Sequence, residues 1–100
     1  MLNVLRTAVS RSAAREVHAH VEQFDGIQSP LGFAAVVLID ESHVSAHCYE
    51  EEEILAVDCF TCGGVDPAGI ADDIHQQLLG AIPAIKLVQR NEIDRFVMEG

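Results

Sequence analysis

Glu41, Ser42 and His43 form a short polar segment directly after an apolar run over residues 33–39. A serine hydroxyl can attack the carbonyl of the residue before it and convert that peptide bond into an ester. This attack requires a strained turn and a nearby group that transfers protons. Histidine suits the second role because its pKa lies near neutrality. The segment therefore has the residue types that such an attack requires.

Two further residues extend this pattern at fixed distances from Ser42. His47 follows Ser42 by five residues, and Cys62 follows it by twenty, within the sequence Phe-Thr-Cys-Gly. The whole pattern resembles the prokaryotic S-adenosylmethionine decarboxylases, a pyruvoyl-dependent family whose proenzyme cuts itself at Glu-Ser. The resemblance covers roughly residues 17–90 and is strongest over 32–63.

The resemblance implies a role for each of these residues. Ser42 becomes a pyruvoyl group, whose ketone takes up the substrate amine and acts as an electron sink. His47 serves self-processing, and Cys62 returns a proton after carbon dioxide leaves. Tyr49 stacks on adenine and Glu51 binds the ribose. The implied substrate is a small cationic molecule that contains an amino acid, S-adenosylmethionine, decarboxylated for spermidine synthesis without a metal.

Some positions depart from the family pattern and leave alternatives open. Ala34 stands where the family usually has a serine or threonine that helps processing, and Ile27 or Gln28 replaces one of two adenine-stacking aromatic residues. The lost aromatic and the acidic run 50–53 also fit a pyruvoyl-dependent arginine or ornithine decarboxylase. Ala34, together with the absence of a strand that the family has before its first helix, fits an inactive paralogue that pairs with an active partner.

A zinc module is a further interpretation. Cys59 and Cys62 have the spacing of a zinc knuckle, and His47 with Cys48 could complete four ligands. In an extended strand, however, residues three positions apart point to opposite faces. The sequence therefore favours the pyruvoyl interpretation over a metal site.

The composition limits the domain organisation and the partners. One hundred residues predict a single domain over 1–100. Six basic and sixteen acidic residues give a net charge of −10, which argues against nucleic acid or an anionic membrane and suits a cationic substrate. Three cysteines without a secretory signal indicate a reducing cytoplasm. No apolar run approaches the length of a membrane span.

Hydrophobic periodicity predicts the secondary structure. Residues 1–15 have the pattern of a first helix, although their basic composition imitates a mitochondrial presequence. We expect strands over 16–24, 33–39, 43–49, 54–61 and 83–89, and a helix that begins at Asp66-Pro67 and stops at Gly80. His18 and His20 share the polar face of the first strand, where solvated histidines are more common than metal ligands.

This order of elements predicts an α+β fold, a two-layer sandwich with an antiparallel sheet and helices on one face. The continuous apolar run 33–39 implies a central strand covered on both faces. Alternation along the next strand places His47 on the same face as His43, close behind the scissile bond. The small core and the family's construction from two protomers favour a homodimer with active sites at or near the contact. The tail residues Phe96-Val97-Met98 are expected to pack on a neighbour.

Overall fold

The computed structural model describes residues 1–62 and 65–93 of the chain. Within this part, two helices and four strands follow one another as α1 (Leu2–Arg11), β1 (Glu16–Phe24), β2 (Gly32–Ile39), β3 (Ser42–Tyr49), β4 (Ile54–Phe60) and α2 (Pro67–Ala81). The chain folds as the α+β sandwich that its sequence predicts, and the bounds of β1 agree with the prediction.

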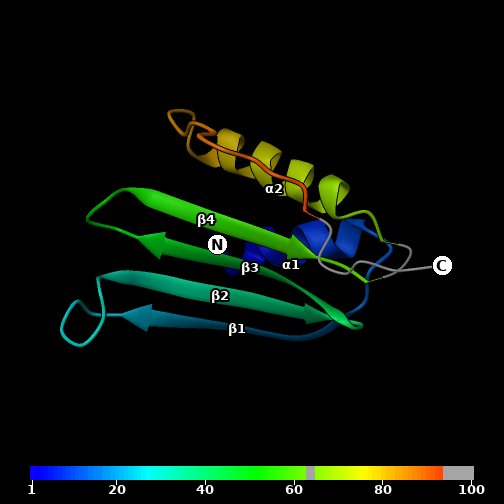
Figure 1. The fold of residues 1–100 in the computed structure, drawn as a ribbon, viewed down its shortest axis with the longest axis horizontal. Coiled ribbons are helices and arrows are strands. Elements are labelled where there is room, and N and C mark those ends of the chain that lie inside the picture. The colour runs from blue at the N-terminus through cyan, green and yellow to red at the C-terminus, as the bar shows by residue number, and fades with distance from the viewer. Residues whose placement is uncertain (63–64, 94–100) are drawn as a thin grey trace.

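The four strands form one antiparallel sheet in chain order (Figure 1). Short connections join consecutive strands, so each pair is a hairpin. At one end of the sheet lie the β2–β3 turn, the end of β4 and the start of α2; at the other end lie the β1–β2 and β3–β4 loops (Figure 1). This division into two ends decides which functional residues can meet within one chain.

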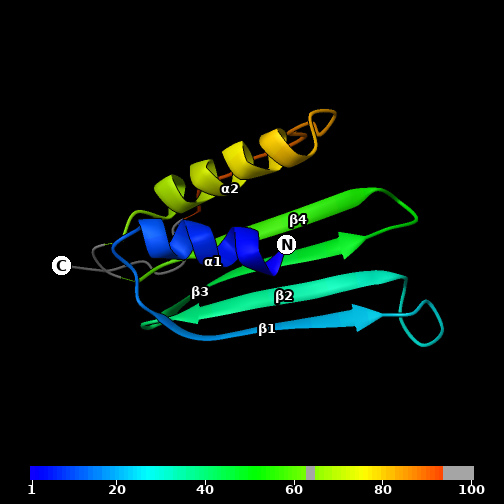
Figure 2. The same cartoon turned by 180° about the vertical axis from the view of Figure 1, so that it is seen from behind.

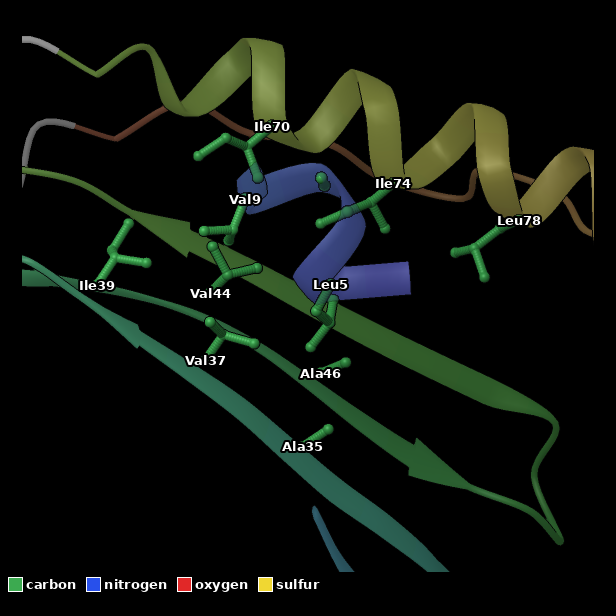
Figure 3. Close-up of a cluster of buried hydrophobic side chains, with 11 residues drawn as sticks. Leu5, Val9, Ala35, Val37, Ile39, Val44, Ala46, Ile70, Ile74 and Leu78 are labelled. Carbon is green, nitrogen blue, oxygen red and sulfur yellow. The ribbon is translucent and has the colours of Figure 1, made fainter. Parts of the chain in front are cut away.

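The core lies between one face of the sheet and the two helices (Figures 2 and 3). Its side chains come from both helices and from alternate positions of the two central strands, as a half-covered strand requires. The buried apolar residues are Leu5, Ala8, Val9, Ala35, Val37, Ile39, Val44, Ala46, Ile70, Ile74 and Leu78. The first helix is therefore an integral part of the packed domain.

The opposite face of the sheet is not covered by either helix. Leu38 on β2 is 42% exposed on this face. The expectation that both faces of β2 are covered is therefore wrong for the single chain, because the helices lie on the same side. On the edge strand β1, His20 and Glu22 also stand on the open face, with His20 Nε2 2.9 Å from Glu22 Oε2.

Helix α2 begins as its sequence predicts. The Asp66 carboxylate accepts a hydrogen bond from the Ala68 N–H at 3.0 Å, and Pro67 occupies the first turn. Both features are typical of a helix N-terminus. The helix ends at Ala81, so it runs through Gly80 rather than stopping there.

The predicted last strand over residues 83–89 does not form. The segment instead leaves α2 through a turn and runs back beside it (Figure 1). Two side chains explain this path: Ile85 packs against the core, and Arg90 binds the Asp72 carboxylate and the Ala68 carbonyl of α2. These contacts hold the segment on the helix rather than at a strand edge.

The apolar tail residues Phe96-Val97-Met98 lie outside the described residues. Within residues 1–62 and 65–93, no helix is long and apolar enough to cross a membrane.

Candidate active site

The turn between β2 and β3 carries backbone strain at the residue before the serine. Glu41 has a φ of 59°, in the left-handed region that residues other than glycine rarely adopt. Such a conformation costs on the order of 1–3 kcal/mol and persists only where neighbouring contacts fix it. The strain lies directly at the Glu41–Ser42 bond, where the sequence predicts cleavage.

The hydroxyl of Ser42 is held by the backbone of Cys62. The Cys62 N–H donates a hydrogen bond to Ser42 Oγ at 2.8 Å, across twenty residues of sequence. This contact joins the start of β3 to the segment that follows β4. The structure therefore brings together Ser42 and Cys62, two of the three residues with an expected catalytic role.

A pocket of about 250 Å³ opens beside this turn. Its walls come from the linker before β1, the β2–β3 turn and the segment after β4. The lining residues are Ala13, Ala14, Arg15, Ile39, Asp40, Glu41, Ser42, Thr61, Cys62 and Val65. Ser42 and Cys62 thus face a common space on the side of the sheet that the helices cover.

His43 lies on the open face of the sheet and is anchored to β4. Its Nε2 lies 3.0 Å from Asp58 Oδ2, and its ring centroid lies 5.4 Å from that of Phe60. The sequence interpretation gave no role to Asp58 or Phe60. Asp58 and Phe60 are two residues apart in a strand, so the sequence predicts that they share a face. Only the alignment of β3 with β4 shows that His43 is the residue they contact.

His47 does not lie close to the Glu41–Ser42 bond of its own chain. It stands on the open face with His43, as expected, but five residues beyond Ser42, which corresponds to about 16 Å along a strand. Ser42 pairs with Ile39 and faces the covered side of the sheet. The expected proximity is therefore wrong within one chain, because strand geometry separates the two residues by length and by face.

The two expected substrate-binding residues share the end of the sheet with His47. Tyr49 is the last residue of β3, and Glu51 lies in the loop that follows. Both are exposed. Seven residues separate Tyr49 from Ser42, about 23 Å along the strand. We call the end of the sheet with Ser42 and Cys62 the cleavage end, and the end with His47, Tyr49 and Glu51 the binding end, after the roles expected from the sequence.

Ala34 lies directly opposite His47 in the pairing of β2 with β3. Side chains of directly opposed residues lie on the same face, about 4.5–5.5 Å apart at their Cβ atoms. The sequence marked Ala34 as a departure from the family pattern without locating it. A hydroxyl at position 34 would therefore stand next to His47.

The cysteines differ in their surroundings. Cys59 lies on the covered face of β4, packed against the core, whereas Cys62 is exposed at the pocket. Burial, followed by the charge of Asp58, raises the pKa of the Cys59 thiol to about 11. Across residues 1–62 and 65–93, no three His, Cys, Asp or Glu side chains gather as a metal site would require.

The fold and the turn define a small two-layer α+β domain with a serine at a strained Glu-Ser bond. Residues 1–91 match the family model described as S-adenosylmethionine decarboxylase. The chain therefore belongs to the S-adenosylmethionine decarboxylase family.

Individual relatives agree with this assignment. An S-adenosylmethionine decarboxylase proenzyme from Symbiobacterium thermophilum is 36% identical over 88 residues, which cover 87% of this chain and 64% of the relative. An S-adenosylmethionine decarboxylase proenzyme 2 from Bacillus cereus is 38% identical over 75 residues, covering 75% of this chain and 58% of the relative. The chain thus spans less than two thirds of the length of these curated relatives.

Proposed function

We propose that this chain cleaves itself between Glu41 and Ser42 and then decarboxylates S-adenosylmethionine with a pyruvoyl group derived from Ser42. The observation that carries this proposal is the strained Glu41 backbone beside a Ser42 hydroxyl that the Cys62 N–H holds at 2.8 Å. Membership of the S-adenosylmethionine decarboxylase family agrees with it.

Self-cleavage begins at the Ser42 hydroxyl. Its oxygen attacks the Glu41 carbonyl carbon, and the peptide bond becomes an ester as the amide nitrogen takes up a proton. Elimination then releases the Glu41 carboxylate, and hydrolysis of the remaining dehydroalanine gives the pyruvoyl end and ammonia. Relief of the Glu41 strain favours the first step. The hydrogen bond from the Cys62 N–H holds the attacking Ser42 oxygen in place during this step.

The residues around Ser42 fit a pyruvoyl group at that position. The Cys62 N–H, which binds the hydroxyl before cleavage, can donate to a carbonyl oxygen afterwards. The group supplies the electron sink for decarboxylation. The exposed Cys62 thiol lines the same pocket and is the candidate to return a proton to the substrate carbon. His43, bound to Asp58, holds the new end of β3 in place.

A homodimer completes the site in this proposal. The cleavage end and the binding end lie at opposite ends of β3, so one chain does not join them. A twofold axis that lies along the open face and perpendicular to β3 would place two copies of β3 in opposite directions. The binding end of one protomer would then approach the cleavage end of its partner. Such a contact would bury Leu38, which is 42% exposed on the open face.

The binding end has groups that suit S-adenosylmethionine. The ring of Tyr49 offers a stacking face for adenine, and the Glu51 carboxylate can accept hydrogen bonds from ribose hydroxyls. The loop 50–53 consists of four acidic residues, and the net charge is −10. This negative field attracts a sulfonium cation.

The test is the mass of the purified chain. The wild-type protein should separate into two fragments under denaturing conditions, and the larger one should resist Edman sequencing because a ketone replaces its amine. Ser42→Ala should remain one chain. Recovery of only intact wild-type protein after prolonged incubation would refute the proposed enzyme and favour an inactive paralogue.

A further inference from the structure

Arg15 and Asp40 form a two-point ion pair directly beside the scissile turn. Arg15 Nη2 donates to Asp40 Oδ1 at 2.7 Å, and Arg15 Nε donates to Asp40 Oδ2 at 2.9 Å. The Asp40 N–H adds a third contact by donating to the Arg15 carbonyl at 3.3 Å. Paired donors of a guanidinium fix the direction of a carboxylate as well as its distance. The residue before Glu41 is therefore held by both its side chain and its backbone.

The strained turn needs such contacts on both sides. Glu41 has a φ of 59°, and a strained residue relaxes unless its surroundings fix it. After the scissile bond, Ser42 Oγ is bound by the Cys62 N–H at 2.8 Å. Before the bond, the fixed residue is Asp40, and its partner Arg15 stands on the linker that enters β1. Two elements far apart in sequence thus restrain the bond from its two sides.

We propose that Arg15 and Asp40 are positioning residues for self-cleavage, whose ion pair holds the turn in the strained conformation from which Ser42 attacks. This inference rests on the proposed self-cleavage and deepens it. Neither residue belongs to the Glu-Ser-His pattern. The side chains of Arg15 and Asp40 are 74% and 55% exposed, so packing does not hold them. Their mutual contact is what ties the linker to the turn.

Both side chains of the pair are ionised at neutral pH. The hydrogen bond from Arg15 holds the pKa of Asp40 below its usual value, and the same hydrogen bond raises the pKa of Arg15. Because the pair is exposed, salt screens it. The restraint should therefore weaken at high ionic strength, whereas the contact between Ser42 and Cys62 is a neutral hydrogen bond and should not.

The chain contains a matched control pair. Arg6 Nε donates to Glu16 Oε1 at 2.8 Å, and Arg6 Nη2 donates to Glu16 Oε2 at 3.1 Å. This pair has the same two-point chemistry and also ties the helix layer to the start of β1. It is not among the residues of the pocket at the scissile turn. Loss of Arg6 therefore measures the general effect of losing such a pair.

The experiment compares rates of self-cleavage in freshly synthesised full-length chains. Arg15→Ala and Asp40→Ala should each slow cleavage by about three- to fivefold, the effect of losing an exposed two-point ion pair. Arg15→Lys, which keeps one contact, should recover part of the rate. The exchanged pair Arg15→Asp with Asp40→Arg should cleave faster than either single reversal. Arg6→Ala should cleave at the wild-type rate.

Two additional measurements separate positioning from stability. About 1 M sodium chloride should slow the wild-type chain and leave Arg15→Ala unchanged, since the Debye length falls to about 3 Å. Thermal unfolding is measured for Arg15→Ala and Arg6→Ala in the uncleavable Ser42→Ala background. Similar unfolding temperatures combined with different cleavage rates support the inference.

Other outcomes overturn it. Cleavage of Arg15→Ala at the wild-type rate would refute the positioning role and leave self-cleavage intact. Equal slowing by Arg15→Ala and Arg6→Ala would assign the effect to general destabilisation and also refute it. A wild-type chain that never cleaves would refute the proposed function, and this inference with it.

Discussion

Ser42 and His47 lie on the same strand, but on opposite faces of the sheet and five residues apart. No side-chain rotation brings them together, because about 16 Å of strand separates their backbones. If both act in processing, they act from different chains. A role of His47 in processing Ser42 therefore requires that two chains assemble.

The first prediction is complementation between two inactive variants. Ser42→Ala lacks the proposed nucleophile and His47→Ala lacks the proposed processing histidine, so each should remain intact by itself. In a mixed dimer, one site would combine Ser42 of the His47→Ala chain with His47 of the Ser42→Ala chain. Co-expression with tags of different size should therefore yield fragments of the His47→Ala chain only.

Two results would contradict a shared site. Mixed dimers that form but yield no fragments would show that His47 does not act across the contact. Cleavage of His47→Ala alone at the wild-type rate would remove His47 from processing altogether.

The second prediction concerns the position opposite His47. Ala34→Ser restores a hydroxyl beside the imidazole and should speed self-cleavage by about two- to tenfold, the range that one net hydrogen bond supplies. Ala56 flanks His47 on the other side, in β4. Ala56→Ser is the control and should leave the rate unchanged. Equal acceleration by both serines would indicate a general effect on the strands.

The third prediction separates the cysteines by function. Cys62→Ala should still process but decarboxylate about 10²–10⁴-fold more slowly, because the proposed general acid is lost. Cys59→Ala removes a thiol from the core face and should lower stability with little effect on turnover. Rates of carbon dioxide release from fully processed protein measure the difference. Unchanged turnover in Cys62→Ala would show that another group returns the proton.

The fourth prediction uses the pKa of Cys59, which burial raises to about 11. A raised pKa keeps the thiol protonated, so at pH 8 only about one molecule in a thousand carries the reactive thiolate. Iodoacetamide at pH 8 should therefore modify the exposed Cys62 first and leave Cys59 unmodified. Modification of Cys59 should increase as the pH rises toward 11. Peptide mass mapping locates the label, and early labelling of Cys59 would contradict its burial.

Local patterns in the sequence were sufficient to predict most of the fold. Val44 and Ala46 alternate with His43 and His47, and the structure buries the first two on the helix side of the sheet. Asp66 caps α2 as predicted. These features depend on neighbours within a few residues, so periodicity and cap chemistry reveal them.

The remaining features depend on contacts between distant residues. The segment 83–89 has the composition of a strand, yet contacts of Ile85 and Arg90 hold it beside α2. In the sequence, Arg15 is one of several basic residues of the first segment. The fold places it against Asp40, twenty-five residues away. A linear pattern contains no information about such pairing, and the separation of Ser42 from His47 became evident only with the faces of β3.

The last prediction concerns the substrate. A processed chain should release labelled carbon dioxide from carboxyl-labelled S-adenosylmethionine and not from arginine or ornithine. The reason lies in Tyr49 and Glu51, which offer a stacking face for adenine and a hydrogen-bond acceptor for ribose. Arginine and ornithine have neither adenine nor ribose.

Variants at the binding end test this reason. Tyr49→Ala should raise KM about 5- to 150-fold, since one stacking contact contributes about 1–3 kcal/mol, whereas Tyr49→Phe should retain most of the affinity. Glu51→Gln should weaken binding, and Glu52→Gln removes the same charge from the same loop as the control. An equal loss in both glutamine variants would assign the effect to the acidic field of the loop rather than to a ribose contact. Turnover of arginine or ornithine without S-adenosylmethionine turnover would refute the substrate assignment and leave the pyruvoyl mechanism in place.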